Sequence, residues 1–185
     1  MTFQFKLIIF IVASIVIAWI SRASLRDFRS HGFYRFLAWE AMLVLVLLNI
    51  NYWFYEPFSA HQIIAWLLLI ISLFLVIYGV QLLHQAAKSE SERSDPSLME
   101  FEKTTELVTT GIYRYIRHPL YSSLLFLAWG VFFKQPSWLG VCLAAMATFF
   151  LTMTAKTEEA ENIRFFGATY QSYMKQSRMF IPFLF

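Results

Sequence analysis

The sequence has few charged residues and almost no cysteine. Only 15% of its 185 residues are charged, against about 25% in an average soluble domain. This scarcity argues against a nucleic-acid partner and against a disordered tail, because both need many charges. Because 58% of the residues are hydrophobic, more than a soluble protein of this size can bury, we predict one integral membrane domain over residues 1–185, in contact with the lipid bilayer.

Cys142 is the only cysteine. One thiol forms no internal disulfide, and the sequence contains no cysteine-rich zinc pattern. Cys142 lies within an apolar run, where a small packing residue is its ordinary role. We therefore expect neither a disulfide framework nor a metal site.

Five apolar runs follow one another along the chain. Crossing a hydrocarbon core takes about 20 helical residues, and the Lys-Gln-Pro-Ser turn between the last two runs is typical of a tight helical hairpin. The runs cover residues 7–20, 36–54, 63–83, 120–133 and 138–154. We predict an all-α membrane protein with about five transmembrane helices: three within residues 1–83, and a hairpin in residues 120–154. The first run could also be a signal peptide, but further spans follow it directly and the cleavage site is weak.

Lysine and arginine are distributed unevenly between the two sides of these spans. Residues 21–35 hold four, residues 84–119 hold five and residues 155–185 hold four, whereas only Lys6 and Lys134 fall on the other side. Positively charged loops stay in the cytoplasm. We therefore predict an external N-terminus, a cytoplasmic loop over 84–119 and a cytoplasmic tail over 155–185. The short chain favours the inner or plasma membrane of a prokaryote.

One carboxylate falls inside a predicted span. Glu40 lies near the start of the second run, and an ionisable residue within the membrane is a candidate for function. Glu40 is therefore a candidate contact for a hydrophobic substrate, unless its side chain merely reaches the interface. Asn49 and Asn51, at the other end of the run, are expected to form hydrogen bonds between helices.

Polar functional groups gather where the predicted hairpin begins and where it ends. Because the two arms are adjacent, we expect Arg117, His118 and Tyr121 to lie near Glu158 and Glu159. A cationic and aromatic group opposite two carboxylates suits a small zwitterionic ligand. The same residues would also serve as interfacial anchors and a solvated turn.

Backbone amides near the hairpin offer a second means of binding. Free N–H groups around Gly111, and at the helix start marked by Pro119, suit anionic groups of a ligand.

The tail contains an amphipathic pattern. Four residues spaced by 3, 4 and 3 positions predict one helical face, which would pack on the membrane surface or close over a bound ligand. They are Ile163, Phe166, Tyr170 and Tyr173.

The segment Leu107-Val-Thr-Thr-Gly-Ile-Tyr-Arg-Tyr-Ile-Arg-His-Pro-Leu-Tyr121 resembles the signature of the isoprenylcysteine carboxyl methyltransferase family, to which phospholipid N-methyltransferases are related. An acidic pair follows, then Phe166-Gly-Ala-Thr-Tyr-Gln-Ser-Tyr173 and Ile181-Pro182. The resemblance covers roughly residues 105–182. It implies an S-adenosylmethionine-dependent methyltransferase that acts at the cytoplasmic membrane face on a hydrophobic or lipidated acceptor, with a carboxylate, thiol or amine as the methylated group.

The resemblance also implies which residues contact the cofactor. They are Thr105, Glu106, Leu107, Val108, Tyr113, His118, Pro119, Leu120, Tyr121 and Glu158. Gly111, with its free backbone amides, and Glu159, of the acidic pair, are further candidate cofactor contacts. As catalytic candidates we take Glu158, His118 and Arg117, since methyl transfer needs an aligned donor and acceptor in a site without water. If the acceptor is an amine, its proton would pass either to a carboxylate of the site or to neutral His118.

One position departs from the family pattern. The eukaryotic prenylcysteine enzymes have a substrate-facing arginine where this chain has Thr154, and the nearby Lys156 is not on the same helical face. The resemblance therefore does not extend to recognition of a prenylcysteine carboxylate. Two other interpretations stay open: an NADPH-dependent membrane reductase of similar architecture, and a non-enzymatic membrane protein with a degenerate site.

Overall fold

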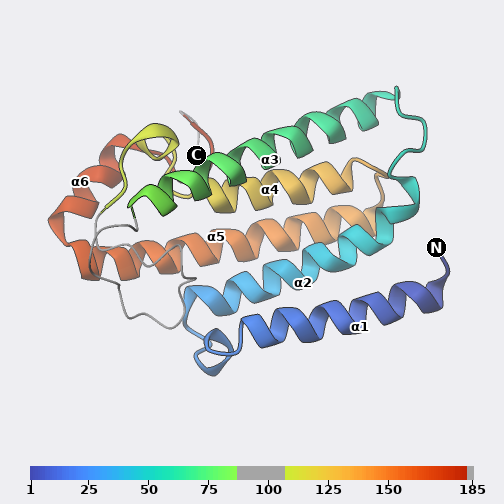
Figure 1. The fold of residues 1–185 in the computed structure, drawn as a ribbon, viewed down its shortest axis with the longest axis horizontal. Coiled ribbons are helices and arrows are strands. Elements are labelled where there is room, and N and C mark those ends of the chain that lie inside the picture. The colour runs from blue at the N-terminus through green and yellow to red at the C-terminus, as the bar shows by residue number, and fades with distance from the viewer. Residues whose placement is uncertain (87–106, 183–185) are drawn as a thin grey trace.

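The computed structural model describes residues 1–86 and 107–182 and consists of long helices packed side by side (Figure 1). The long helices are α1 (Phe3–Ile20), α2 (His31–Asn49), α3 (Ala60–Ala86), α4 (Pro119–Phe132) and α5 (Trp138–Phe166). The short ones are η1 (Ser24–Arg26), η2 (Ile50–Tyr52), η4 (Gly111–Arg114) and α6 (Ala168–Gln176). The predicted all-helical fold with an α4–α5 hairpin is confirmed.

The long helices stack in the order α3, α4, α5, α2, α1 (Figure 1). Helices α1, α2, α3 and α5 are long and apolar enough to cross a membrane. Helix α4 has 14 residues and is only about 21 Å long at the ordinary helical rise. The N-terminus lies at the opposite end of the bundle from α6 (Figure 1).

Close packing between the central helices depends on small residues. Ala41 of α2, Ala128 of α4, and Ala144 and Ala147 of α5 belong to one buried cluster. Small side chains let helix backbones approach closely, which replaces the hydrophobic driving force that is missing in lipid. Asn49 donates a hydrogen bond from Nδ2 to the Val131 carbonyl oxygen (2.8 Å), so the bond predicted between helices is present.

Helix α2 begins earlier than its apolar run suggested. The Ser30 hydroxyl accepts a hydrogen bond from the Phe33 N–H (3.2 Å) and caps the helix, which then starts at His31. Serine at this position satisfies a donor that the first turn leaves unpaired. As a result Arg35, expected in a loop, lies within the helix and is buried.

Helix α5 does not stop at Thr154 but continues to Phe166. Gly167 then adopts φ 60°, a left-handed conformation that glycine accepts without strain, and the chain turns into α6. The prediction that Ile163, Phe166, Tyr170 and Tyr173 share one helical face is therefore wrong, because the glycine places the two tyrosines on a separate helix. Both tyrosines are buried.

The turn between α4 and α5 holds a buried cation. Lys134, which the sequence placed in a polar turn, is completely buried. Its Nζ donates to Gln62 Oε1 (3.0 Å) and lies 3.4 Å from the centroid of the Trp66 ring. The Gln62 amide donates in return to the Lys134 carbonyl oxygen (3.0 Å). Burial lowers the pKa of the Lys134 ammonium, and this network fastens the hairpin turn to α3.

Replacement of Lys134 by methionine is expected to destabilise the protein by about 2–4 kcal/mol, because it removes a charge-assisted hydrogen bond and a cation–π contact. Thermal unfolding of the detergent-purified variant measures the loss. Lys156→Met, which changes an exposed lysine of α5, is the matched control. Equal melting temperatures for the two variants would contradict a stabilising role for the network.

Candidate active site

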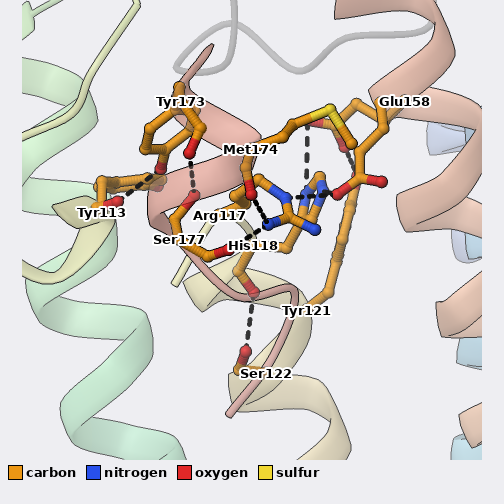
Figure 2. Close-up of polar contacts among 10 residues, drawn as sticks. Tyr113, Arg117, His118, Tyr121, Ser122, Glu158, Tyr173, Met174 and Ser177 are labelled. Carbon is orange, nitrogen blue, oxygen red and sulfur yellow. Dashed lines mark hydrogen bonds and ion pairs between the residues drawn. The ribbon is translucent and has the colours of Figure 1, made fainter. Parts of the chain in front are cut away.

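The candidate side chains come together where the start of α4 faces the C-terminal half of α5, the half that we predict to lie on the cytoplasmic side (Figure 2). The Tyr121 hydroxyl donates to Glu158 Oε2 (2.5 Å), and Arg117 Nε donates to Glu159 Oε1 (2.6 Å). The juxtaposition predicted from the hairpin is therefore present. Since Glu158 and Glu159 are successive residues of one helix, their carboxylates reach two different partners on the facing turn.

His118 lies between the two carboxylates. Its side chain is buried, with Nδ1 at 3.9 Å from Glu158 Oε1 and Nε2 at 3.4 Å from Glu159 Oε1. Nε2 forms no hydrogen bond within the part of the chain that the structure describes. The imidazole stacks on the Tyr121 ring, with centroids 5.4 Å apart and planes inclined by 18°. This places a polar aromatic surface beside the Glu158 carboxylate.

The Arg117 guanidinium donates hydrogen bonds to three acceptors. Besides Glu159, its guanidinium donates to the carbonyl oxygens of Ser177 (2.6 Å) and Met174 (3.3 Å) (Figure 2). The side chains of Arg117 and Glu159 are only 9% and 8% exposed. Arg117 therefore connects α5 and the end of α6 to the turn that precedes α4.

Residues 177–180, which we name the C-terminal strap, run beside the motif that precedes α4. Arg178 donates its N–H to the Tyr115 carbonyl oxygen (2.9 Å) and accepts from the Arg117 N–H (2.7 Å). The His118 N–H donates to the Met179 carbonyl oxygen (3.2 Å). The strap thus holds the backbone from Tyr115 to His118 in place. No local sequence pattern predicts this contact.

Helix α6 is fastened to the same motif through two tyrosines. The Tyr173 hydroxyl donates to the Tyr113 carbonyl oxygen (2.5 Å) (Figure 2). Burial raises the pKa of the Tyr173 phenol, so the hydroxyl remains a donor at neutral pH. Tyr173 also lines a groove of about 330 Å³ together with Leu107 and Arg114, a volume at the lower end of ligand pockets.

The other residues expected at the cofactor site fall in several places. Thr105 and Glu106 lie outside the described residues. Val108 is partly buried. Gly111 has φ 58°, and a Cβ there would approach Leu82 Cδ1 to 2.7 Å, so the absence of a side chain lets this turn lie against α3.

Pro119 and Leu120 form the first turn of α4. Like the first turn of every helix, it leaves backbone N–H donors without helical partners.

Glu40 lies apart from this cluster. Its Oε2 accepts a hydrogen bond from the Ser14 hydroxyl of α1 (2.7 Å). The contact ties the outermost helix to α2.

Three residues near the site were not predicted from the sequence: His31, Arg35 and Glu161. His31 Nδ1 lies 2.6 Å from Glu161 Oε2, and both His31 and Arg35 interact electrostatically with Glu158. A lone histidine at the start of a helix has no distinctive pattern. Only the packing of α2 against α5, elements far apart in the sequence, reveals this cluster.

Comparisons with known proteins indicate the family of this chain. A family model described as phospholipid methyltransferase matches residues 60–169. Protein-S-isoprenylcysteine O-methyltransferase of Schizosaccharomyces pombe is 34% identical over 79 residues, which are 42% of this chain and 34% of that protein. Methanethiol S-methyltransferase of Crocosphaera subtropica is 24% identical over 135 residues, which are 71% of this chain and 47% of that protein. No solved structure matches.

The matched segments cover between a third and a half of each curated relative. The family model, in contrast, covers more than half of this chain and includes α3, α4, the whole of α5 and the residues His118, Tyr121 and Glu158. These comparisons favour the methyltransferase interpretation over the reductase and the non-enzymatic alternatives. The chain belongs to the phospholipid methyltransferase family.

Proposed function

We propose that this protein is an S-adenosylmethionine-dependent methyltransferase that acts on a lipidic or isoprenoid acceptor at the cytoplasmic membrane face. The observation that supports this most directly is the convergence of His118, Tyr121 and Glu158 at one end of an apolar bundle. The excess of lysine and arginine in the segments at that end supports a cytoplasmic orientation.

The residues present fit this cofactor. Glu158 retains 20% side-chain exposure and suits the ammonium or a ribose hydroxyl of the cofactor. His118 Nε2 is buried and, within the described segments, has only the Glu159 carboxylate, at 3.4 Å, beside it, so it can serve as a further polar contact. Arg117 is already occupied by three acceptors, so we assign it a positioning role and expect backbone N–H groups of the first turn of α4 to hold the cofactor carboxylate.

When bound, S-adenosylmethionine supplies a methyl group on a positively charged sulfur. The stacked rings of His118 and Tyr121 offer aromatic faces, which attract such a cation. Glu158 would balance the positive charge of the bound cofactor in a site that is largely shielded from water, where electrostatic interactions are strong. The Tyr121 hydroxyl holds the Glu158 carboxylate in place.

The acceptor reaches this site from the membrane in our proposal. The relatives are named for isoprenylcysteine and methanethiol, and the family for phospholipids. Isoprenylcysteine and phospholipids carry long hydrophobic chains, whereas methanethiol carries only a methyl group. Helices α2, α3 and α5 are long and apolar enough to lie in the bilayer around the site. An acceptor with a long hydrophobic chain can enter laterally between helices.

Binding of S-adenosylmethionine and its demethylated product to the detergent-purified protein tests the proposal. We expect saturable binding of both, and at least about tenfold weaker binding in His118→Ala, in line with the loss of a stacked polar contact in a buried site. His61→Ala, at the far end of the bundle, should bind as the wild type does. If the folded protein binds neither compound, or binds NADPH instead, the proposal is wrong.

A further inference from the structure

A second histidine–carboxylate pair lies beside the candidate active site, on α2. The His31 side chain is completely buried, and its Nδ1 lies 2.6 Å from Glu161 Oε2 of α5. This contact joins residues 130 positions apart. Helix α2 lies outside the segment that the family model matches, so nothing in the comparisons assigns a role to His31.

The other ring nitrogen of His31 is the informative atom. Nε2 is buried and has no hydrogen-bond partner in residues 1–86 or 107–182. A carboxylate that accepts from Nδ1–H fixes the imidazole tautomer and leaves a lone pair on Nε2. A neutral histidine held in this way is arranged to accept a proton from a group that approaches Nε2.

The groups around His31 narrow the choice of acceptor. Glu158 and Glu161 face His31 from α5, and Arg35 lies one turn further along α2. A carboxylate acceptor carries no proton near neutral pH and needs no base. An ammonium group holds its proton firmly near neutral pH, so a base of the strength of histidine leaves almost all of it protonated and unreactive. A thiol is also protonated near neutral pH, but its pKa lies closer to that of histidine, so a thiol both needs a base and can be deprotonated by this one.

We propose that His31, oriented by Glu161, is the general base for methylation of a thiol carried on a hydrophobic chain. This inference rests on the proposed methyltransferase function. As the acceptor S–H bond breaks, the proton passes to His31 Nε2, and the sulfur electron pair forms the bond to the methyl carbon. The bond between that carbon and the donor sulfonium breaks, and its electron pair stays on the donor sulfur, which becomes a neutral thioether. His31 returns the proton to water after the product leaves.

Three acceptors with the same chain test the inference: octanethiol, octanoate and octylamine. We expect the wild type to methylate octanethiol in preference to the other two. His31→Gln should lower kcat/KM for octanethiol by about 100-fold or more near neutral pH, the usual contribution of a general base. The kcat/KM of the variant for octanethiol should then rise about tenfold for each unit that the pH is raised, because the fraction of free thiolate rises. The kcat/KM of the wild type should vary less steeply with pH.

Three controls separate this role from a structural one. His61→Gln, at the opposite end of the bundle, should behave as the wild type. Glu161→Gln, which keeps a hydrogen-bond acceptor for Nδ1 but removes the charge, should show a smaller loss with the same pH dependence. Binding of S-adenosylhomocysteine should be unchanged in His31→Gln, and this measurement also shows that the variant is folded.

Several results would overturn the assignment. Methylation of octanoate or octylamine but not octanethiol by the wild type would exclude the thiol. A loss in His31→Gln without a steeper pH dependence would indicate a purely structural histidine. Failure of the wild type itself to bind S-adenosylhomocysteine would refute the proposed function, a result distinct from these two.

Discussion

Substitution of Glu158 by glutamine is expected to lower the rate of methyl transfer by about 100-fold or more while the helical bundle stays folded. Loss of one preorganised electrostatic group from a shielded site typically has this effect. Glutamine keeps the volume of the side chain and an oxygen that can accept from the Tyr121 hydroxyl, which now donates to Glu158. The negative charge that faces His118 is the only large change.

Transfer of labelled methyl groups from S-adenosylmethionine by the purified enzyme measures this effect. Glu56→Gln is the matched control, because Glu56 is exposed and lies in the connection between α2 and α3 at the other end of the bundle. A fall in kcat at constant KM for the cofactor would assign Glu158 to the methyl-transfer step, whereas a rise in KM alone would assign it to cofactor binding. Activity equal to that of the control would refute both roles.

Arg117→Met is expected to lower the stability of the protein by about 3–5 kcal/mol, since it removes the arginine partner of the buried Glu159 carboxylate. Glu159 would keep its charge in surroundings where its side chain is only 8% exposed. The carbonyl oxygens of Met174 and Ser177 would also lose their donor. Reversible unfolding in mixed micelles measures the difference, with Arg164→Met, an exposed arginine of α5, as the control.

The double variant Arg117→Met with Glu159→Met provides a sharper test of the same pair. Replacement of both members of a buried ion pair by apolar residues is often neutral or stabilising. We therefore expect the double variant to regain most of the stability that Arg117→Met loses, so that the two effects are strongly non-additive. If the double variant instead loses as much stability as Arg117→Met and Glu159→Met lose together, Arg117 acts mainly through the carbonyl oxygens of Met174 and Ser177.

The transmembrane helices were predictable because lipid imposes a simple requirement on them. A helix surrounded by hydrocarbon is apolar on most of its faces, so a hydrophobic run nearly coincides with α3 and with α4. The start of α2 was not predictable from hydrophobicity, since Ser30 sets it through a capping bond and the first five residues of the helix include His31 and Arg35. The extension of α5 beyond Thr154 was not predicted either, because residues 155–166 are too polar to continue an apolar run.

The site was predictable only as far as local connectivity reaches. The hairpin brings Tyr121 and Glu158 together because two adjacent antiparallel helices must share an end. The strap beside His118 and the contact between His31 and Glu161 depend on packing of segments that are distant in sequence. Neither has a periodicity or a motif that a reader of the sequence can recognise.

The C-terminal strap has a consequence for the order in which the protein matures. During synthesis the N-terminal segments leave the ribosome first, so all the long helices are made before residues 177–180 appear. Until then the backbone around His118 lacks the hydrogen bonds that Arg178 and Met179 provide. The nascent chain can therefore insert its helices into the membrane while its site is still incomplete. Completion of the site therefore follows synthesis of the strap, and we expect a chain truncated just before residue 177 to insert its helices but to lack an ordered site.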